Sequence, residues 1–384
     1  MKDLTIVFHD DSIKSGATSS MLDLIPELKT RFNIRAVIPM RQGDLESYLE
    51  SNGIEYVSCR YYSSRMKNCS SQIQNIKAIT KNFIKIIISF FYYIVNFRFF
   101  MRSDIIYSNT SDSCFGLFAS ILFRKPHVLH VREFGMRDQN VSHFFGDELY
   151  YRLAAKYSRQ IIVISKSLKK HIFYYLPTEE LKSKINLVYD DVHFKELSNR
   201  SLPEVMSLKL LVVGTLSLGK GQEFIIEAIN CLSKRNVFVE LGIVGDDTTP
   251  YALYLKNKVI KLGLTEQVIF HGFCKDMSTL RSQYPIAVVA SKSEAFGRVT
   301  IEAMGNKQLV VASDTGANPE LVKDLYNGYL YNTDDIDSFC RVLENIIVTD
   351  TENLNEIIER GFEFSRKFSG NKAGESITKV VSNI

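Results

Sequence analysis

One pattern of apolar and polar positions repeats along the whole chain. Short apolar runs rich in Val and Ile alternate with polar turns and with longer segments whose apolar positions recur every three or four residues. Such runs are typical of buried parallel strands, and such segments are typical of amphipathic helices. The alternation predicts α/β layers with parallel sheets and with ligand sites at the carboxyl ends of the strands.

A chain of 384 residues is long for one core and predicts about two domains. The predicted domains are residues 1–195 and 204–360, joined by a polar hinge at 195–203, and a final segment, 361–384, carries a helix near 370–381. In the first domain we expect strands at residues 4–8, 34–38, 104–107, 128–131, 161–165 and 185–188.

Composition favours a cytoplasmic protein. The cysteines are scattered without Cys-x-x-Cys spacing, which predicts reduced thiols and no metal site. The first residues carry too much acid and too short an apolar stretch for a secretory signal. Residues 86–97 are apolar and uncharged, but this stretch is shorter than the roughly 20 residues that cross a bilayer.

The strongest chemical signal lies at residues 291–311, where Glu294 and Glu302 bracket the pair Phe296-Gly297. An apolar run at 286–290 predicts a strand, and a helix is predicted to start near Gly297. The first N–H groups of a helix have no partner within the helix, and its dipole favours negative charge there. This turn is therefore a candidate binding site for a diphosphate.

The two carboxylates are predicted to reach different parts of one elongated ligand. Carboxylates accept hydrogen bonds from vicinal hydroxyls, so a sugar and a ribose on either side of a diphosphate fit this arrangement. Arg298 lies in the first helical turn, where a cation opposes the dipole and calls for a nearby anion. The alternative is an i, i+4 pair between Arg298 and Glu302, worth about 0.2–0.5 kcal/mol.

A second turn between strand and helix carries Lys220. The apolar run 210–213 is followed by Gly214-Thr215 and, after Lys220, by a helical pattern, so the lysine can neutralise charge that builds on a departing phosphate. The spacing from Gly214 to Lys220 is close to that of an NTPase phosphate-binding loop. Residue 221 is glycine, however, where that loop needs a Ser or Thr to bind magnesium, so the NTPase interpretation is a minor one.

Together these segments resemble the retaining glycosyltransferases of family four. Their GT-B fold sets two Rossmann-like domains with parallel sheets face to face across a cleft, with the last helix crossing back to the first domain. The resemblance rests on the segment VGTLSLGKGQ, on Gly245-Asp246, on the Glu294/Glu302 pair and on residues 314–320. It implies an N-terminal acceptor-binding domain and a C-terminal domain that binds a UDP- or GDP-linked sugar.

The resemblance also implies roles for single residues. Glu294 contacts hydroxyls of the donor sugar, Glu302 contacts the ribose, and Lys220 holds the leaving diphosphate. Further donor contacts fall on Gly214, Thr215 and the backbone amides of the stretch Phe296, Gly297, Arg298 and Val299. Thr215 stands where members often have an arginine, and we hypothesise that Arg298 compensates for it. Ala317 replaces the second glycine of the loop near Gly316, and we assign no role to Asp190-Asp191.

In the N-terminal half the resemblance matches Gly16, in Ser15-Gly16-Ala17-Thr18, to a glycine-rich acceptor loop. It matches His130 to a histidine at a strand end that contacts the donor sugar. The alternative is that His130 is a satisfied structural residue, since a histidine at the end of a buried strand is often only that. Arg132 and Glu133 are weaker candidates for contacts with the acceptor.

Residues 56–103 contain no Asp or Glu, whereas eight Lys and Arg residues are interspersed with Phe, Ile and Tyr. Such a segment suits an anionic membrane surface, where each basic residue contributes about 1 kcal/mol. The alternative is that Ile84, Ile87, Ile88, Phe91, Ile94 and Val95 form the buried stripe of a domain helix. Single-stranded nucleic acid is disfavoured, because no RNP-like or OB-like pattern is present.

The leading hypothesis is a peripheral enzyme on the cytoplasmic face of the cell membrane. It would transfer a hexosyl group from a nucleotide-sugar to a lipid-linked saccharide or glycolipid in capsule, exopolysaccharide or lipopolysaccharide biosynthesis. The resemblance implies retention of configuration with no cofactor and no essential metal. Two alternatives stay open: a GT-B sugar-nucleotide epimerase, and a non-catalytic partner that binds a nucleotide-sugar.

Overall fold

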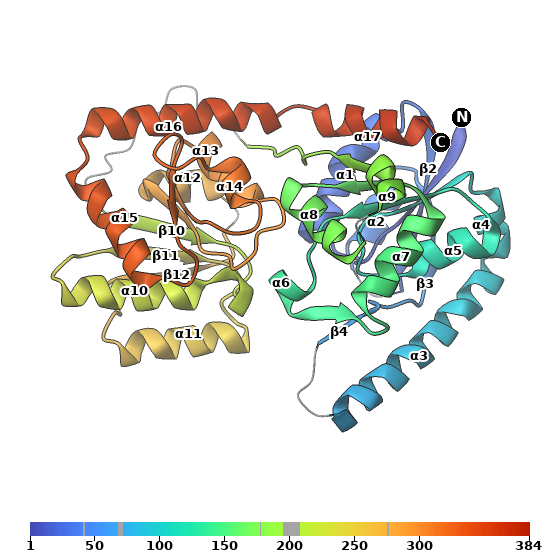
Figure 1. The fold of residues 1–384 in the computed structure, drawn as a ribbon, viewed down its shortest axis with the longest axis horizontal. Coiled ribbons are helices and arrows are strands. Elements are labelled where there is room, and N and C mark those ends of the chain that lie inside the picture. The colour runs from blue at the N-terminus through green and yellow to red at the C-terminus, as the bar shows by residue number, and fades with distance from the viewer. Residues whose placement is uncertain (41–42, 68–71, 177, 195–207, 275) are drawn as a thin grey trace. The chain divides into compact units, whose positions relative to one another are not determined.

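The chain folds into two compact units, each with its own parallel sheet. A computed structural model describes residues 1–384 except 41–42, 68–71, 177, 195–207 and 275. The first unit comprises Met1–Asp191 together with Asn371–Ile384, and the second comprises Val192–Gly370 (Figure 1). The predicted hinge at 195–203 lies outside the described residues, and residues 361–370 belong with the second unit.

The first unit is built on a seven-stranded sheet in the order β3-β2-β1-β5-β6-β8-β9, in which every pairing is parallel. A separate antiparallel pair joins β4 to β7. The strands are β1 (Lys2–Val7), β2 (Phe32–Pro39), β3 (Glu55–Cys59), β4 (Arg65–Lys67), β5 (Ile105–Ser108), β6 (His127–Val131), β7 (Val141–His143), β8 (Ser158–Val163) and β9 (Ile185–Leu187).

Alternate residues of these strands contact helices on opposite faces of the sheet, because successive strand side chains point in opposite directions. Ile6 belongs to the core shared with α1 and α17, whereas Val7 belongs to the core shared with α3, α4 and α5. The helices are α1 (Gly16–Leu28), α2 (Leu45–Ser51), α3 (Gln72–Val95), α4 (Phe97–Arg102), α5 (Phe115–Phe123), α6 (Met136–Gln139), α7 (Asp147–Tyr157), α8 (Lys166–Tyr175), α9 (Glu179–Lys184) and α17 (Lys372–Ser382).

The C-terminal helix α17 is part of the first unit. Ile377 and Val381 are fully buried in the same core as residues of α1. At its N-terminus the backbone N–H of Ala373 donates to the Asp191 carboxylate at 2.8 Å, and Asn371 donates to Glu27 of α1 at 2.8 Å. Asp191, to which no role was assigned from the sequence, therefore fixes the start of this helix.

The second unit is built on a six-stranded parallel sheet in the order β12-β11-β10-β13-β14-β15. Its strands are β10 (Lys209–Val213), β11 (Glu240–Val244), β12 (Val268–Gly272), β13 (Ile286–Val289), β14 (Leu309–Ser313) and β15 (Tyr329–Tyr331). Its helices are η1 (Leu218–Lys220), α10 (Gln222–Lys234), α11 (Pro250–Lys261), α12 (Met277–Gln283), α13 (Arg298–Gly305), α14 (Asn318–Leu321), α15 (Ile336–Val348), α16 (Thr351–Ser365) and η2 (Arg366–Phe368).

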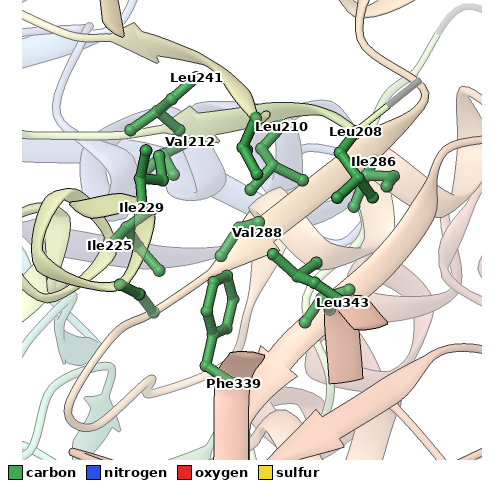
Figure 2. Close-up of a cluster of buried hydrophobic side chains, with 14 of the residues drawn as sticks. Leu208, Leu210, Val212, Ile225, Ile229, Leu241, Ile286, Val288, Phe339 and Leu343 are labelled. Atoms are coloured by element: carbon green, nitrogen blue, oxygen red, sulfur yellow. The ribbon is translucent and has the colours of Figure 1, made fainter. Parts of the chain in front are cut away.

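The main core of the second unit lies on one face of this sheet. Figure 2 shows Leu210 and Val212 of β10 with Val288 of β13 beside Ile225 of α10 and Phe339 of α15. Burying each such side chain contributes about 1.5–3 kcal/mol, so this layer holds β10 and β13 as neighbours. Their carboxyl ends therefore meet at one edge of the sheet, where the candidate site lies.

The predicted fold class, two parallel α/β sheets, is confirmed. Each strand expected in the first half is present within a few residues of its predicted bounds. The strands β3, β4 and β7 were not predicted, because they are short or only partly buried. The apolar stretch was placed at residues 86–97 alone, whereas α3 extends from Gln72 to Val95, and its segment Ala78–Val95 is long and apolar enough to cross a membrane.

The first unit buries four histidines: His127, His130, His143 and His171. Burial lowers the pKa of His127 to about 3 and the pKa of His171 to about 4, in the second case with help from nearby Arg137. The pKa values of His130 and His143 also lie well below 6.5, first because of burial and then because of neighbouring arginines. Below about pH 6.5 these histidines bind protons in the unfolded chain but stay neutral in the folded chain. Stability should therefore fall as the pH falls below 6.5, by about 1.4 kcal/mol per pH unit for each such group.

The variant His171→Phe is expected to reduce this acid sensitivity. The His171 ring packs edge-on against Phe134 and Tyr175, with centroids 5.2 Å apart in each case, so phenylalanine keeps the aromatic contacts and removes the titration. Between pH 6.5 and 5 the variant should lose about 1.5 kcal/mol less unfolding free energy than the parent. Urea unfolding at both pH values measures this difference, and equal losses in the two proteins would contradict the neutral, buried state of His171.

Candidate functional site

Glu294 and Lys220 meet at the carboxyl end of the second sheet. Glu294 lies in the loop after β13, and its carboxylate accepts from Lys220 Nζ at 2.8 Å and from Ser291 Oγ at 2.8 Å. The Glu294 side chain is 17% exposed and that of Lys220 is 36% exposed. The two residues that the sequence assigned to the sugar and the diphosphate are therefore adjacent, and a small ligand can still reach both.

The ionised form of Glu294 is favoured by these partners. Burial alone raises the pKa of the Glu294 carboxyl, but the charge of Lys220 and the hydrogen bonds from Lys220 and Ser291 outweigh it and leave the pKa below 4.5. An ionised carboxylate only accepts hydrogen bonds, so it suits the hydroxyl groups of a sugar.

Close backbone packing holds the loops after β10 and β13 together. The backbone N–H of Lys292 donates to the carbonyl oxygen of Gly219 at 2.9 Å. Gly221 has a φ of +71°, and a Cβ on it would overlap the carbonyl oxygen of Ala290. Only glycine fits there, and this close approach is what brings Lys220 to Glu294.

The loop after β14 also packs closely against Glu294. Gly316 has a φ of +60°, and a Cβ on it would overlap the backbone N and O of Glu294. The backbone N–H of Ala317 donates to the Glu294 carbonyl oxygen at 2.7 Å. Three loops of the sheet edge therefore fix the position of Glu294, and Ala317 supplies its contact through the main chain.

Helix α13 starts at Arg298, directly after the Phe296-Gly297 pair, as the sequence predicts. Gly297 has a φ of +101°, and a Cβ on it would lie 2.7 Å from a methyl carbon of Leu321. Phe296 is buried with its ring 5.8 Å from that of Phe368. The first-turn residues Arg298 and Val299 remain partly exposed, so their amides lie at the positive end of the helix dipole near the surface.

Glu302 has a partner that no sequence motif predicts. Arg281 of α12 is 1% exposed, and it donates to Glu302 at 3.1 Å and to Gln308 at 2.7 Å. Gln308 in turn donates to the carbonyl oxygen of Tyr284 at 2.7 Å. Arg281 therefore positions Glu302. No local motif marks Arg281, because its partners lie 21 and 27 residues away in the sequence.

Gly214 and Thr215 follow β10 at the same sheet edge. Gly214 has a φ of +145°, and space is open around its α-carbon on the side where a Cβ would stand. Thr215 is exposed, and its carbonyl oxygen accepts from the Gln222 side chain at 3.0 Å, which ties this turn to the start of α10. Both residues are therefore accessible at this edge of the sheet.

The predicted residues of the first unit lie at the corresponding edge of the other sheet. Gly16 is the first residue of α1, and Ser15 before it contacts His9 Nε2 at 3.5 Å. His130 of β6 is fully buried, and its Nδ1 lies 2.6 Å from Tyr107 Oη and 3.3 Å from Arg132 Nη2. Since arginine only donates, Nδ1 accepts and the hydrogen of the neutral ring is on Nε2, which has no hydrogen-bond partner among the described residues.

Arg132 and Glu133 take part in buried pairs. Arg132 donates twice to the Asp190 carboxylate, at 2.6 and 2.8 Å, which gives Asp190 a structural role. Glu133 accepts from the backbone N–H and the hydroxyl of Ser111 at 2.8 and 2.7 Å. Burial raises the pKa of Glu133. Across the described parts of both units, no group of three or more His, Cys, Asp or Glu residues is placed to hold a metal ion.

The second unit, whose loops carry Glu294 and Lys220, is similar to a known protein family. Residues 194–364 match the family described as Glycosyl transferases group 1. The matched part of the chain is similar to a glycosyltransferase group 1 domain. It coincides with the second unit almost from end to end, and the match does not extend to the first unit.

Two relatives and one solved structure are also similar to the chain. The chain is 26% identical over 289 residues to an uncharacterized glycosyltransferase, MJ1178, of Methanocaldococcus jannaschii, covering 73% of this chain and 76% of the relative. It is 28% identical to the lipopolysaccharide core biosynthesis mannosyltransferase LpcC of Rhizobium leguminosarum, over 33% of this chain and 38% of LpcC. The structure of Anabaena HepE in complex with UDP and glucose matches at a TM-score of 0.73 and 20% identity, covering all of both chains. The shared fold is GT-B, as the sequence resemblance implied.

Proposed function

We propose that the protein is a retaining glycosyltransferase that moves a sugar from a nucleotide-sugar to a lipid-linked saccharide or glycolipid. The observation that carries the proposal is the contact between Lys220 and Glu294 beside the N-terminus of α13. It places a cation, an ionised carboxylate and the positive end of a helix dipole at one edge of a parallel sheet. That combination fits an anionic diphosphate with hydroxyl-bearing groups on both sides.

The donor would lie along this edge with its diphosphate at the first turn of α13 and at Lys220. Glu294 would then accept hydrogen bonds from hydroxyls of the transferred sugar. Glu302, held by Arg281, would accept from the ribose. Since Arg281 is buried and satisfied by Glu302 and Gln308, it acts as a positioning residue and does not touch the ligand.

In the proposed reaction the bond between the anomeric carbon and the diphosphate oxygen breaks, and a bond from the acceptor oxygen forms on the same face of the sugar. The leaving diphosphate takes the proton of the acceptor hydroxyl. Lys220 and the amides of α13 stabilise the charge that develops on the diphosphate oxygens, which is the largest contribution that the residues of this site offer. Neither a protein nucleophile nor a metal ion is needed in this scheme.

The acceptor and the setting are inferred from the relatives. LpcC is named for lipopolysaccharide core biosynthesis, and HepE was solved with UDP and glucose. We infer that a UDP- or GDP-linked hexose is the donor. The acceptor is a lipid-linked saccharide of cell-surface polysaccharide synthesis, used at the cytoplasmic face of the membrane.

An acceptor requirement tests the proposal. Purified protein is incubated with UDP- and GDP-hexoses in chelator, with and without extracted bacterial lipids, and free nucleoside diphosphate and labelled lipid are measured. The proposal predicts that nucleotide release and lipid labelling both depend on added lipid. Sugar conversion without lipid would point to an epimerase, and donor binding without either product would point to a non-catalytic partner. Each of those two outcomes would overturn the transferase assignment.

A further inference from the structure

The outward face of α3 is apolar along the part of the helix whose side chains are described. Ile79, Phe83, Ile84, Ile87, Phe90, Phe91, Ile94 and Val95 are each at least 44% exposed, and Ile94 reaches 72%. They recur every three or four residues, in part as adjacent pairs, which places them on one side of the helix. Figure 1 shows α3 as the long helix at the edge of the first unit. Soluble monomers rarely leave so continuous an apolar strip uncovered, so the strip marks an interaction surface.

The opposite side of α3 packs on the first unit. Tyr93 is 1% exposed, donates from its hydroxyl to the carbonyl oxygen of Phe115 at 2.7 Å, and stacks on the Phe115 ring at 4.4 Å. Asn82 is also buried. If α3 crossed a bilayer surrounded by lipid, it would lose the buried contacts of Asn82 and Tyr93 with its own domain. The predicted alternative, a buried apolar stripe, is wrong, because the apolar side faces outward.

The charge around this strip is positive. Lys81 of α3 and Arg98 of α4 are exposed, and α4 adds the exposed apolar residues Phe97 and Met101 to the same surface region. Residues 56–103 contain no acidic side chain at all. A second copy of the chain docked on the same face would bring these cations against their own counterparts. A lipid surface would attract the cations through its anionic headgroups and bury the exposed apolar side chains in its apolar interior.

We propose that the outward face of α3, continued by Phe97, Arg98 and Met101 of α4, docks on an anionic lipid bilayer with α3 lying in the plane of the interface. Ile87, Phe91 and Ile94 enter the boundary between headgroups and acyl chains. Lys81 and Arg98 contact lipid phosphates. The exposed strip from Ile79 to Val95 gives a contact about 24 Å long.

This proposal names the surface by which the protein reaches the lipid-linked acceptor, and to that extent it rests on the proposed function. Vesicle binding needs neither donor nor acceptor, so the two proposals fail separately. A protein that binds vesicles but transfers no sugar would refute the first alone. One that transfers sugar to soluble acceptor analogues but does not bind vesicles would refute the second alone.

The absence of tryptophan from the chain allows a clean test. The variant Phe91→Trp places a single fluorophore on the strip, at a position 60% exposed. Its matched control is Phe238→Trp, at a position 67% exposed in the second unit. Each protein is titrated with vesicles of phosphatidylcholine alone or with about 30% phosphatidylglycerol, an anionic content that gives a strongly negative surface potential. Both kinds of vesicle are prepared with and without brominated acyl chains.

The proposal predicts a blue shift and bromine quenching for the Phe91→Trp protein with the anionic vesicles only, and neither change for the Phe238→Trp protein. Adding Lys81→Glu and Arg98→Glu to the Phe91→Trp protein should weaken vesicle binding about tenfold or more, since each reversal replaces an attraction to the lipid phosphates by a repulsion. Circular dichroism checks that this variant stays folded.

Three results would each overturn the proposal. The first is absence of quenching in the Phe91→Trp protein, and the second is equal binding to neutral and anionic vesicles. The third is a blue shift of the Phe91→Trp protein that depends on protein concentration without lipid, which would indicate a second copy of the chain on this face.

Discussion

Replacing Glu294 by glutamine is expected to lower kcat about 10²–10³-fold with little change in thermal stability. Glutamine keeps the shape of the side chain but has no negative charge. The Glu294 carboxylate pairs with Lys220 at 2.8 Å and accepts a hydrogen bond from Ser291 at 2.8 Å. It also replaces an acceptor-only group by one that presents N–H groups to sugar hydroxyls. A loss of this size is typical when one preorganised polar group is removed from an active site. Steady-state kinetics with saturating acceptor measures it.

A matched control separates chemistry from ion-pair loss. Glu359 of α16 pairs with Lys307, also at 2.8 Å, away from the three loops that hold Glu294. Glu359→Gln removes an ion pair of similar length and should keep kcat within about twofold, since partly exposed pairs contribute roughly 0–1 kcal/mol. If Glu294→Gln turned over as fast as Glu359→Gln, the assignment of Glu294 to the transferred sugar would be wrong.

Lys220→Met is the second variant with a large expected effect. Methionine keeps much of the length of lysine but cannot donate to the diphosphate, so kcat should again fall about 10²–10³-fold, and donor affinity should fall with it. Lys292→Met is the control, because Lys292 lies in the loop after β13, is 51% exposed and pairs with Asp334 at 3.3 Å. That variant should retain normal kinetics, as measured by kcat and KM for the donor.

The charge-swapped double variant, Lys220→Glu with Glu294→Lys, distinguishes catalysis from structure. It rebuilds an opposite-charge pair between the two loops, so a purely structural role predicts recovery of both stability and turnover. The proposed roles differ, because the diphosphate needs the cation at residue 220 and the sugar needs the carboxylate at residue 294. We expect the double variant to regain the stability that each single charge reversal loses, but not to regain turnover. Recovery of turnover in this variant would refute the separate roles.

Local sequence signals were sufficient for much of the site. A β-branched run, a polar loop and a Gly followed by an amphipathic pattern predicted β13 and the start of α13 at Arg298, because each signal depends on neighbouring residues. The same applies to β10 and to the turn with Lys220. The sequence could also predict that these two turns share an edge, since parallel strands bring their carboxyl ends together.

Contacts between distant residues could not be predicted in this way. Arg281 meets Glu302 through a tertiary contact between α12 and α13, and a single arginine in a short helix carries no signal of its own. The need for glycine at residues 221 and 316 comes from close approach to Ala290 and Glu294, which depends on tertiary packing. Asp190 likewise finds Arg132, 58 residues earlier in the chain.

The helix α3 shows another limit of pattern reasoning. An apolar stripe at helical spacing predicts a helix with one apolar side, but the same stripe serves a protein core, a partner or a lipid surface equally well. The structure excludes the core, because Tyr93, not Ile94 or Phe91, faces the domain. The sequence features that favoured the lipid surface were the lack of acidic residues in 56–103 and the basic residues interspersed there with Phe, Ile and Tyr.

Donor binding by the second unit is the central claim, and thermal unfolding with a panel of nucleotide-sugars in chelator tests it most directly. A ligand at about 100 times its Kd adds about 2.7 kcal/mol to the free energy of unfolding and raises Tm by a few degrees. We predict that one class, the UDP-sugars or the GDP-sugars, produces this shift and that Glu302→Ala abolishes it. Stabilisation by ATP alone, or only after magnesium is restored, would contradict donor binding and favour a nucleotide triphosphatase site at residues 214–221.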